Sequence, residues 1–228
     1  MKKLSLSNYQ LKIIGLIAMT IDHIGLLLFP QQQWMRGVGR LAYPIFAFMI
    51  AQGCLHTRSM GRYLLSTAAV AFVCQMVELL FRGSLYQCIM VTFSLSIALI
   101  WCVKNFRAKK TPGAFVLMLG GFAAAFVICV GLPRWLWPYG FDVDYGIIGV
   151  LIPVAVYLCR DQQQQIWMLI VGLCAQAYCS VQIQWLALLA VPLLQLYNGS
   201  RGRKGLKWFF YLYYPLHLVA IYLVGFVL

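Results

Sequence analysis

The sequence has few charged residues, and very few of them are acidic. Only 10% of its 228 residues are charged and 63% are hydrophobic, whereas soluble domains carry about 25% charged residues. Water could not solvate so apolar a surface, which excludes a soluble enzyme, a secreted domain and a disordered chain. The 18 basic residues outnumber the 5 acidic ones, and in an apolar chain this excess indicates membrane topology rather than a nucleic-acid partner. The sequence therefore predicts an all-α, polytopic protein of the lipid bilayer, with a single domain over residues 1–228.

Common signatures of catalysis, nucleotide binding and metal binding are missing as well. The sequence contains no HExxH, GxSxG, P-loop, GxGxxG or CxxC pattern, and no metal site is expected. The eight cysteines lie mostly in apolar stretches, where a free cysteine packs as a small hydrophobic residue. Cys88, nearest the expected outer surface, is the one candidate for reactivity. No cleavable signal peptide is expected, because the first apolar segment is long and contains Asp22 and His23.

Long apolar runs make up most of the sequence. A helix needs about 20 apolar residues to cross the hydrocarbon core, and this length predicts about nine spans, several of them short. The clear ones are residues 9–30, 63–81, 85–103, 113–132 and 208–228. The weaker ones are residues 38–55, 145–158, 166–180 and 184–196.

The distribution of basic residues predicts the orientation of these spans. With the N-terminus inside, fourteen basic residues fall at expected cytoplasmic positions and four at outer ones, as the positive-inside rule requires. We therefore expect a multi-pass protein of a bacterial-type cytoplasmic membrane, with its N-terminus inside and its C-terminus outside. Topology alone explains most of the basic residues.

Asp22, His23 and His217 lie well inside the predicted spans. Such groups cost about 2.5–3.5 kcal/mol each on insertion scales and by default mark function. Asp22 and His23 are neighbours in the first span, and neighbours on a helix point about 100° apart, so they do not form a simple dyad. His217 lies in the last span after Pro215, at a depth similar to that of His23 when both helices rise about 1.5 Å per residue. The alternative role of these residues is to join helices by hydrogen bonds.

Three other acidic residues, Glu78, Asp142 and Asp144, lie toward the predicted outer side. Asp142 and Asp144, followed by Tyr145, either cap the next helix or attract an amine. Glu78 is expected to pair with one of the arginines at a similar depth, namely Arg36, Arg40 or Arg82.

Several motifs follow one another along almost the whole chain. They are Ile21-Asp22-His23-Ile24-Gly25; Gly39-Arg40-Leu41-Ala42-Tyr43-Pro44-Ile45-Phe46-Ala47-Phe48, with Gly53 and His56-Thr57-Arg58; Asp144-Tyr145-Gly146; and Tyr197-Asn198-Gly199, Arg201-Gly202, Lys207 and Tyr214-Pro215-x-His217. Together they resemble the TraX family of membrane acetyltransferases, whose namesake acetylates the N-terminus of conjugative pilin. Tyr43 stands where the family usually has phenylalanine.

The first span carries a second resemblance. Lys12-x10-His23 is similar to the Arg/Lys-x10-His pattern of multispanning acyltransferases that modify envelope glycans, in which the histidine is catalytic and the acyl-CoA donor is cytoplasmic. The resemblance implies that His23 is catalytic and that His217 and Asp22 support it. A neutral imidazole could act as a general base or could itself accept the acetyl group, and the sequence does not separate these routes.

The resemblance also implies the substrates. Acetyl-CoA would be the acyl donor, and its phosphates would contact basic residues at the cytoplasmic helix ends. The acceptor would be the N-terminal amine of an exported pilin-like protein or, alternatively, an envelope-glycan hydroxyl. The expected donor-binding residues are Lys12, His56, Arg58, Arg62, Lys204 and Lys207, and the expected acceptor-binding residues are Arg40, Asp142, Asp144 and Tyr145.

Two other functions fit the composition. A proton-coupled transporter also uses intramembrane His and Asp with proline-broken helices, although no inverted internal repeat is evident. A membrane-embedded assembly scaffold would need no chemistry at all. The oligomeric state is not indicated by the sequence.

Overall fold

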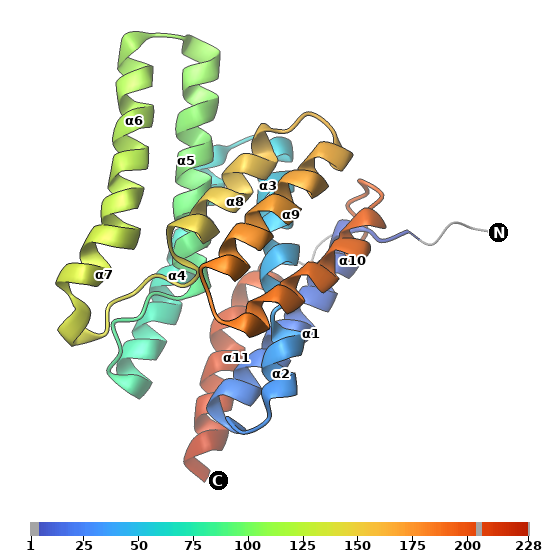
Figure 1. Cartoon of the computed structure of the whole chain (residues 1–228), viewed down its shortest axis with the longest axis vertical. Coiled ribbons are helices and arrows are strands. Elements are labelled where there is room, and N and C mark those ends of the chain that lie inside the picture. Colours follow the sequence, from blue (N-terminus) through green and yellow to red (C-terminus); the bar gives the residue numbers. More distant parts are fainter. Residues whose placement is uncertain (1–4, 204–206, 228) are drawn as a thin grey trace. The chain divides into compact units, whose positions relative to one another are not determined.

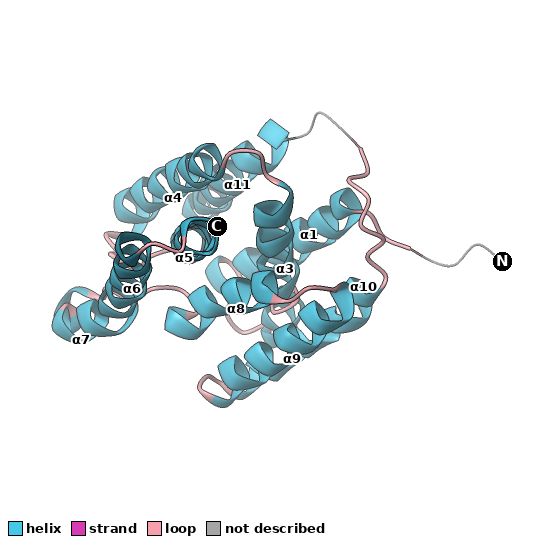
Figure 2. Cartoon of the chain, turned by 90° about the horizontal axis from the view of Figure 1, so that it is seen from above, coloured by secondary structure: helices cyan, strands magenta, loops and turns pink. Residues whose placement is uncertain are grey.

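The computed structural model describes residues 5–203 and 207–227, and these residues are almost entirely helical (Figure 2). In this part of the chain no strand forms, and the only β-type pairs are the isolated bridges Leu6–Tyr197 and Gln87–Val143. Six helical segments are long and apolar enough to cross a membrane. The predictions of an all-α chain and of a polytopic membrane protein are therefore confirmed.

The chain divides into two compact units, which are described separately. The first unit combines residues Met1–Met49 with Cys159–Leu228, and the second is Ile50–Leu158. Helix α3 (Ala42–His56) begins in the first unit and ends in the second.

The first unit brings together helices from both ends of the chain. Helix α1 packs against α2 and α11, whereas α9 packs against the 3-10 helix η3 and against α10 (Figure 1). Helix α1 begins with a capping box, in which the Ser7 hydroxyl accepts from the amide of Gln10 and the Gln10 side chain accepts from the amide of Ser7. The bounds are α1 (Asn8–Leu27), α2 (Gln33–Gly39), α9 (Gln162–Tyr178), η3 (Gln182–Ala190), α10 (Val191–Gln195) and α11 (Lys207–Val227).

The predicted span at 38–55 is interrupted near its start. Helix α2 ends at Gly39 and α3 begins at Ala42, so Arg40 lies at the break. Pro44 has no amide hydrogen to donate to the carbonyl of Arg40, and its ring would clash with that carbonyl in a continuous helix. The sequence thus places a charged residue where the helix is broken.

In the second unit, α5 is the central helix. It packs against α4, α6 and α8, and the Ser96 hydroxyl on α5 donates to the carbonyl of Val150 on α8 at 2.8 Å. Helix α6 continues through the π-helical turn η1, one turn before Pro133, whose missing amide hydrogen removes an α-helical bond. The bounds are α4 (Met60–Arg82), α5 (Ile89–Lys109), α6 (Pro112–Phe126), η1 (Val127–Gly131), α7 (Leu132–Trp135), η2 (Trp137–Tyr139) and α8 (Gly146–Leu158).

Several predicted span boundaries require correction. The span expected at 85–103 begins at Ile89 and continues to Lys109, and Cys88 is its N-cap residue, with a buried side chain. The span expected at 113–132 extends to Trp135. The three short spans expected at 145–158, 166–180 and 184–196 correspond to helices of 13, 17 and 14 residues. At about 1.5 Å per residue these helices are shorter than the hydrocarbon core of about 30 Å.

Candidate functional site

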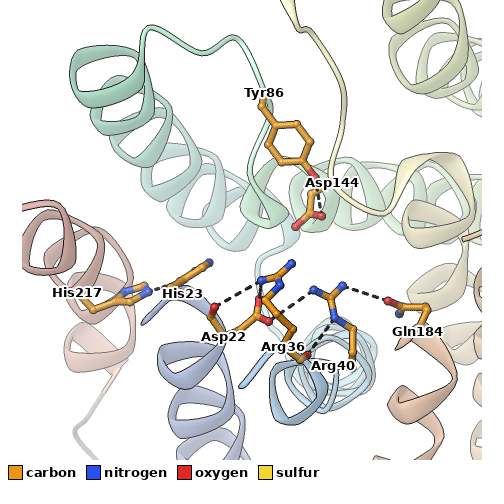
Figure 3. Close-up of polar contacts among 8 residues, drawn as sticks. All are labelled: Asp22, His23, Arg36, Arg40, Tyr86, Asp144, Gln184 and His217. Carbon is orange, nitrogen blue, oxygen red and sulfur yellow. Dashed lines mark hydrogen bonds and ion pairs between the residues drawn. The ribbon is translucent and has the colours of Figure 1, made fainter. Parts of the chain in front are cut away.

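Asp22 and His23 are adjacent on α1 but contact different helices of the first unit. His23 faces α11, whereas Asp22 faces α2 (Figure 3). This divergence follows from the rotation of about 100° between neighbouring helical residues, so the two residues are confirmed not to form a direct dyad. Each contributes to a different cluster.

The first cluster is a pair of histidines joined by a hydrogen bond. Nδ1 of His23 lies 2.7 Å from Nε2 of His217, and the two rings are stacked with centroids 4.9 Å apart. His217 is buried, with an exposed fraction of 7%. The similar depth predicted for the two histidines therefore corresponds to direct contact.

The hydrogen bonds of His217 fix the proton positions in the neutral pair. Nδ1 of His217 lies 3.0 Å from the carbonyl oxygen of Tyr213, which can only accept, so this nitrogen carries the proton. Nε2 of His217 is then an acceptor, and Nδ1 of His23 must be the donor. This leaves the lone pair of His23 on Nε2. Among the residues that the structure describes, none is hydrogen-bonded to that atom.

Aromatic side chains of α11 hold the histidine pair in place. The ring of Tyr213 stacks on His217 at 5.3 Å between centroids, and its hydroxyl lies 2.7 Å from the hydroxyl of Thr20 on α1. Tyr214 packs edge-on against both histidine rings. The orientation of each imidazole is therefore set by hydrogen bonding and by packing.

The second cluster, called the Asp22 cluster, joins the carboxylate of Asp22 to the guanidinium groups of Arg36 and Arg40 (Figure 3). Asp22 Oδ2 lies 2.7 Å from Arg36 Nη1, and Asp22 Oδ1 lies 3.5 Å from Arg40 Nη2. Arg40 also donates to Oε1 of Gln184 on η3 at 3.1 Å. The carboxylate thus contacts the two arginines rather than a histidine.

Close packing between α1 and α2 depends on glycine. A Cβ atom at Gly39 would overlap the side chain of Asp22, and one at Gly25 would lie 2.6 Å from Cβ of Met35. Both glycines belong to the motifs quoted above, and both allow the backbones to approach. Their role is therefore to let Asp22 reach the arginines of α2.

The predicted donor-binding residues fall in both units. Lys12 on α1 places its ammonium 5.5 Å from the ring centroid of Phe210 on α11. His56, Arg58 and Arg62 are exposed in the second unit, and Nδ1 of His56 donates to the carbonyl of Gln52 at 2.8 Å. Lys204, and the side chain of Lys207, lie outside the described residues.

The acidic residues predicted to bind the acceptor lie in the second unit, whereas Arg40 lies in the first. The Tyr86 hydroxyl donates to Asp144 Oδ1 at 2.8 Å, and Asp142 Oδ1 accepts from the amide of Val143 at 2.7 Å. Partial burial and the negative charge of Asp144 raise the pKa of Tyr86, so its hydroxyl stays protonated as a donor. Tyr145 adopts a positive φ of 61° directly before α8.

The sequence predicts the pairing of Glu78 with an arginine correctly, but it does not identify Arg36 and Gln184 as neighbours of Asp22 and Arg40. Glu78 pairs with Arg82 at 3.7 Å, as the expected carboxylate–arginine pairing requires. The sequence suggests Arg36 only as a possible partner of Glu78, and it does not indicate Gln184. The available signal was the four-residue spacing of Arg36 and Arg40, which puts both side chains on one helix face.

Comparison with known proteins identifies the family. The sequence profile described as "TraX protein" matches residues 7–225. A probable fimbrial assembly protein FimC, serogroup H1, of Dichelobacter nodosus is 26% identical over 96% of this chain and 96% of its own length. An uncharacterized protein, RP591, of Rickettsia prowazekii (strain Madrid E) is 26% identical over 69% of this chain and 58% of its own length. No solved structure is significantly similar to the chain. Since the family profile covers nearly the whole sequence, including both clusters, the chain belongs to the TraX family.

Proposed function

We propose that the protein is a membrane-embedded acetyltransferase in which His23 is the general base. The observation that carries this proposal is the hydrogen bond of 2.7 Å between His23 and His217. Because His217 donates from Nδ1 to the backbone of Tyr213, it holds His23 in the tautomer that leaves Nε2 unprotonated. A positioned imidazole with a free lone pair is suited to take a proton from an acceptor.

The reaction would transfer the acetyl group of acetyl-CoA to an amine or a hydroxyl. The acceptor nitrogen or oxygen bonds to the thioester carbonyl carbon while its proton moves to Nε2 of His23. The carbon–sulfur bond then breaks, its electron pair stays on the sulfur of CoA, and the proton returns from Nε2 to that thiolate. General acid–base catalysis of this kind typically contributes about 10²–10⁴-fold in rate.

The assignment of substrates rests on family membership and on charge. The family resemblance and the relative named for fimbrial assembly support the N-terminal amine of an exported pilin-like protein as the acceptor, with a glycan hydroxyl as the alternative. Lys12, whose ammonium lies 5.5 Å from the ring centroid of Phe210, would supply positive charge for the phosphates of acetyl-CoA. Membership of the TraX family also supports a location in the bacterial cytoplasmic membrane.

Purified protein in detergent, supplied with isotope-labelled acetyl-CoA, tests this proposal. We expect label to appear on a peptide with a free N-terminus and not on the same peptide with a blocked N-terminus. His23→Gln should abolish the transfer, whereas Ile17→Ala, a change at an exposed position of the same helix, should not. Saturable proton-coupled flux in liposomes without any acetyl transfer would favour the transporter instead.

A further inference from the structure

His217 occupies the position that a carboxylate has beside many catalytic histidines. In Ser-His-Asp sites, a carboxylate accepts from Nδ1 of the histidine, fixes its tautomer and stabilises its charged form without taking the proton. Here Nδ1 of His23 donates to Nε2 of His217 at 2.7 Å (Figure 3). The carboxylate of the adjacent residue, Asp22, contacts Arg36 and Arg40 instead. The partner of His23 is therefore an imidazole, which is a stronger base than a carboxylate and can take up the Nδ1 proton.

The hydrogen bonds around the pair favour a positive charge on His217. Its Nδ1–H donates to the carbonyl oxygen of Tyr213 at 3.0 Å, and a proton gained on Nε2 would point at Nδ1 of His23. A cationic His23 would keep the bond to His217, but its Nε2–H has no acceptor among the residues that the structure describes. Since a buried charge is tolerated when its hydrogen bonds are made, the pair holds a charge better on His217.

The ring of Tyr213 provides a third contact for this charge. It stacks on His217 with 5.3 Å between centroids and 11° between planes, inside the range of about 6 Å in which an aromatic face attracts a cation. The Thr20 hydroxyl donates to the carbonyl of Leu16 at 2.8 Å, so the Tyr213 hydroxyl must be the donor in its bond of 2.7 Å to Thr20. Tyr213 is therefore held by both α11 and α1, with the face of its ring against His217.

We propose that His217 stores the proton taken from the acceptor and that Tyr213 stabilises the resulting imidazolium. The inference rests on the proposed function, because it assigns the path of the proton in that reaction. As the acceptor proton bonds to Nε2 of His23, the Nδ1 proton of His23 moves to Nε2 of His217. His23 is then neutral in its other tautomer, and His217 carries the charge. When the carbon–sulfur bond breaks, Nε2 of His23 gives its proton to the thiolate of CoA, and Nδ1 takes its proton back from His217.

Nitrogen-15 NMR of the purified full-length protein in detergent shows where an added proton goes, without any turnover. The chain contains 3 histidines, so labelling of histidine alone gives few signals, and His56→Gln identifies those of His56. In the neutral pair, the unprotonated nitrogens are Nε2 of His23 and Nε2 of His217. After the pair takes up one proton, we expect the remaining unprotonated nitrogen to be Nδ1 of His23. An unprotonated Nε2 on His217 would place the charge on His23 and overturn the inference, and so would a pair that takes up no proton while the protein stays folded.

Solvent isotope effects on acetyl transfer test the relay itself. Single-turnover transfer from acetyl-CoA to a peptide is followed in mixtures of H₂O and D₂O. Because two protons move together, the wild-type rate should depend on the D₂O fraction as a curve. His217→Gln keeps an oxygen that accepts from Nδ1 of His23 but cannot take the proton, so its dependence should become linear. A linear dependence in the wild type would contradict the relay.

Substitutions of Tyr213 separate its ring from its backbone carbonyl. Tyr213→Leu removes the ring and should lower the single-turnover rate about tenfold, a typical value for a buried cation–π contact. Tyr213→Phe restores the ring and should recover most of the rate. Phe209→Leu is the matched control, because Phe209 lies about two turns from His217 on the same helix. Equal losses in Tyr213→Leu and Phe209→Leu would contradict the role assigned to Tyr213.

The NMR and transfer experiments distinguish failure of this inference from failure of the proposed function. Acetyl transfer with the charge on His23 would remove the relay and leave the transferase standing. A protonated His217 in a protein that transfers no acetyl group would refute the proposed function and leave the pair as a proton-storing site.

Discussion

His23 donates a hydrogen bond to His217 across 194 positions of sequence, and His217 in turn donates to the backbone of Tyr213. The two bonds form a directed chain that begins at a fixed backbone carbonyl and ends at the free Nε2 atom of His23. His217 is thus a positioning residue in the proposed reaction, whereas His23 touches the acceptor. The distinction leads to different kinetic signatures for the two residues.

Substitution of His217 should lower the rate of acetyl transfer without changing substrate affinity. His217→Phe keeps an aromatic ring for stacking on Tyr213 but removes the acceptor for Nδ1 of His23. The His23 ring can then rotate or change tautomer, and we expect kcat to fall about 10–100-fold, which is less than the roughly 10²–10⁴-fold of a complete loss of general-base catalysis, with KM nearly unchanged. Steady-state kinetics with acetyl-CoA measure this split. A rise in KM with an unchanged kcat would assign His217 to substrate binding instead.

Replacement of Gly39 by alanine should disturb the Asp22 cluster. The added methyl group would overlap the Asp22 side chain and force it away from the arginines, at a cost of about 1–3 kcal/mol in the free energy of unfolding. Thermal and denaturant unfolding in detergent measure this loss. Gly120→Ala provides the control, since a Cβ atom there meets nothing within 4 Å. Equal stability of the two variants would show that α1 and α2 are less tightly packed than the structure indicates.

Removal of the Asp22 charge should destabilise the protein more than removal of the whole ion pair. Asp22→Asn removes the carboxylate charge that Arg36 and Arg40 contact, and we expect a loss of about 2 kcal/mol or more, somewhat below the roughly 3–5 kcal/mol of a fully buried pair. A second change, Arg36→Gln, should restore part of the stability. A double-mutant cycle of the unfolding free energies measures the coupling, and additive losses would contradict a functional ion pair.

Tyr86 should make the stability of the protein fall at alkaline pH. Its pKa is higher in the folded chain than its ordinary value of 10.0, so above that value the folded state holds a proton that the unfolded state has lost. Stability from this group is therefore complete below about pH 10 and decreases as the pH rises further. Unfolding free energies of the wild type and of Tyr86→Phe, measured from about pH 8 to about pH 11, should diverge only at the alkaline end. If the unfolding free energies of the two proteins differ by the same amount at every pH, Tyr86 contributes only its hydrogen bond to Asp144 and no pH-dependent stability.

The sequence alone determined the class of protein and the residues worth examining. Apolar runs of membrane-spanning length define six of the spans, because hydrophobic length needs no partner to be recognised. The scarcity of charge made His23, His217 and Asp22 conspicuous, since each is expensive inside a membrane. Their relative depths followed from the helical rise alone.

Tertiary structure decided which of these residues meet and what each can do. The rotation of each helix about its axis brings His23 to His217 and turns Asp22 toward Arg36 and Arg40. The helical rise per residue predicts how deep a residue lies in the membrane, but it does not predict which neighbouring helix its side chain faces. Gln184 joined the cluster only through the packing of η3 against α2, a contact between segments far apart in sequence. The identity of the proton-accepting nitrogen depends on hydrogen-bond partners, and these are fixed by side-chain geometry in three dimensions rather than by residue type.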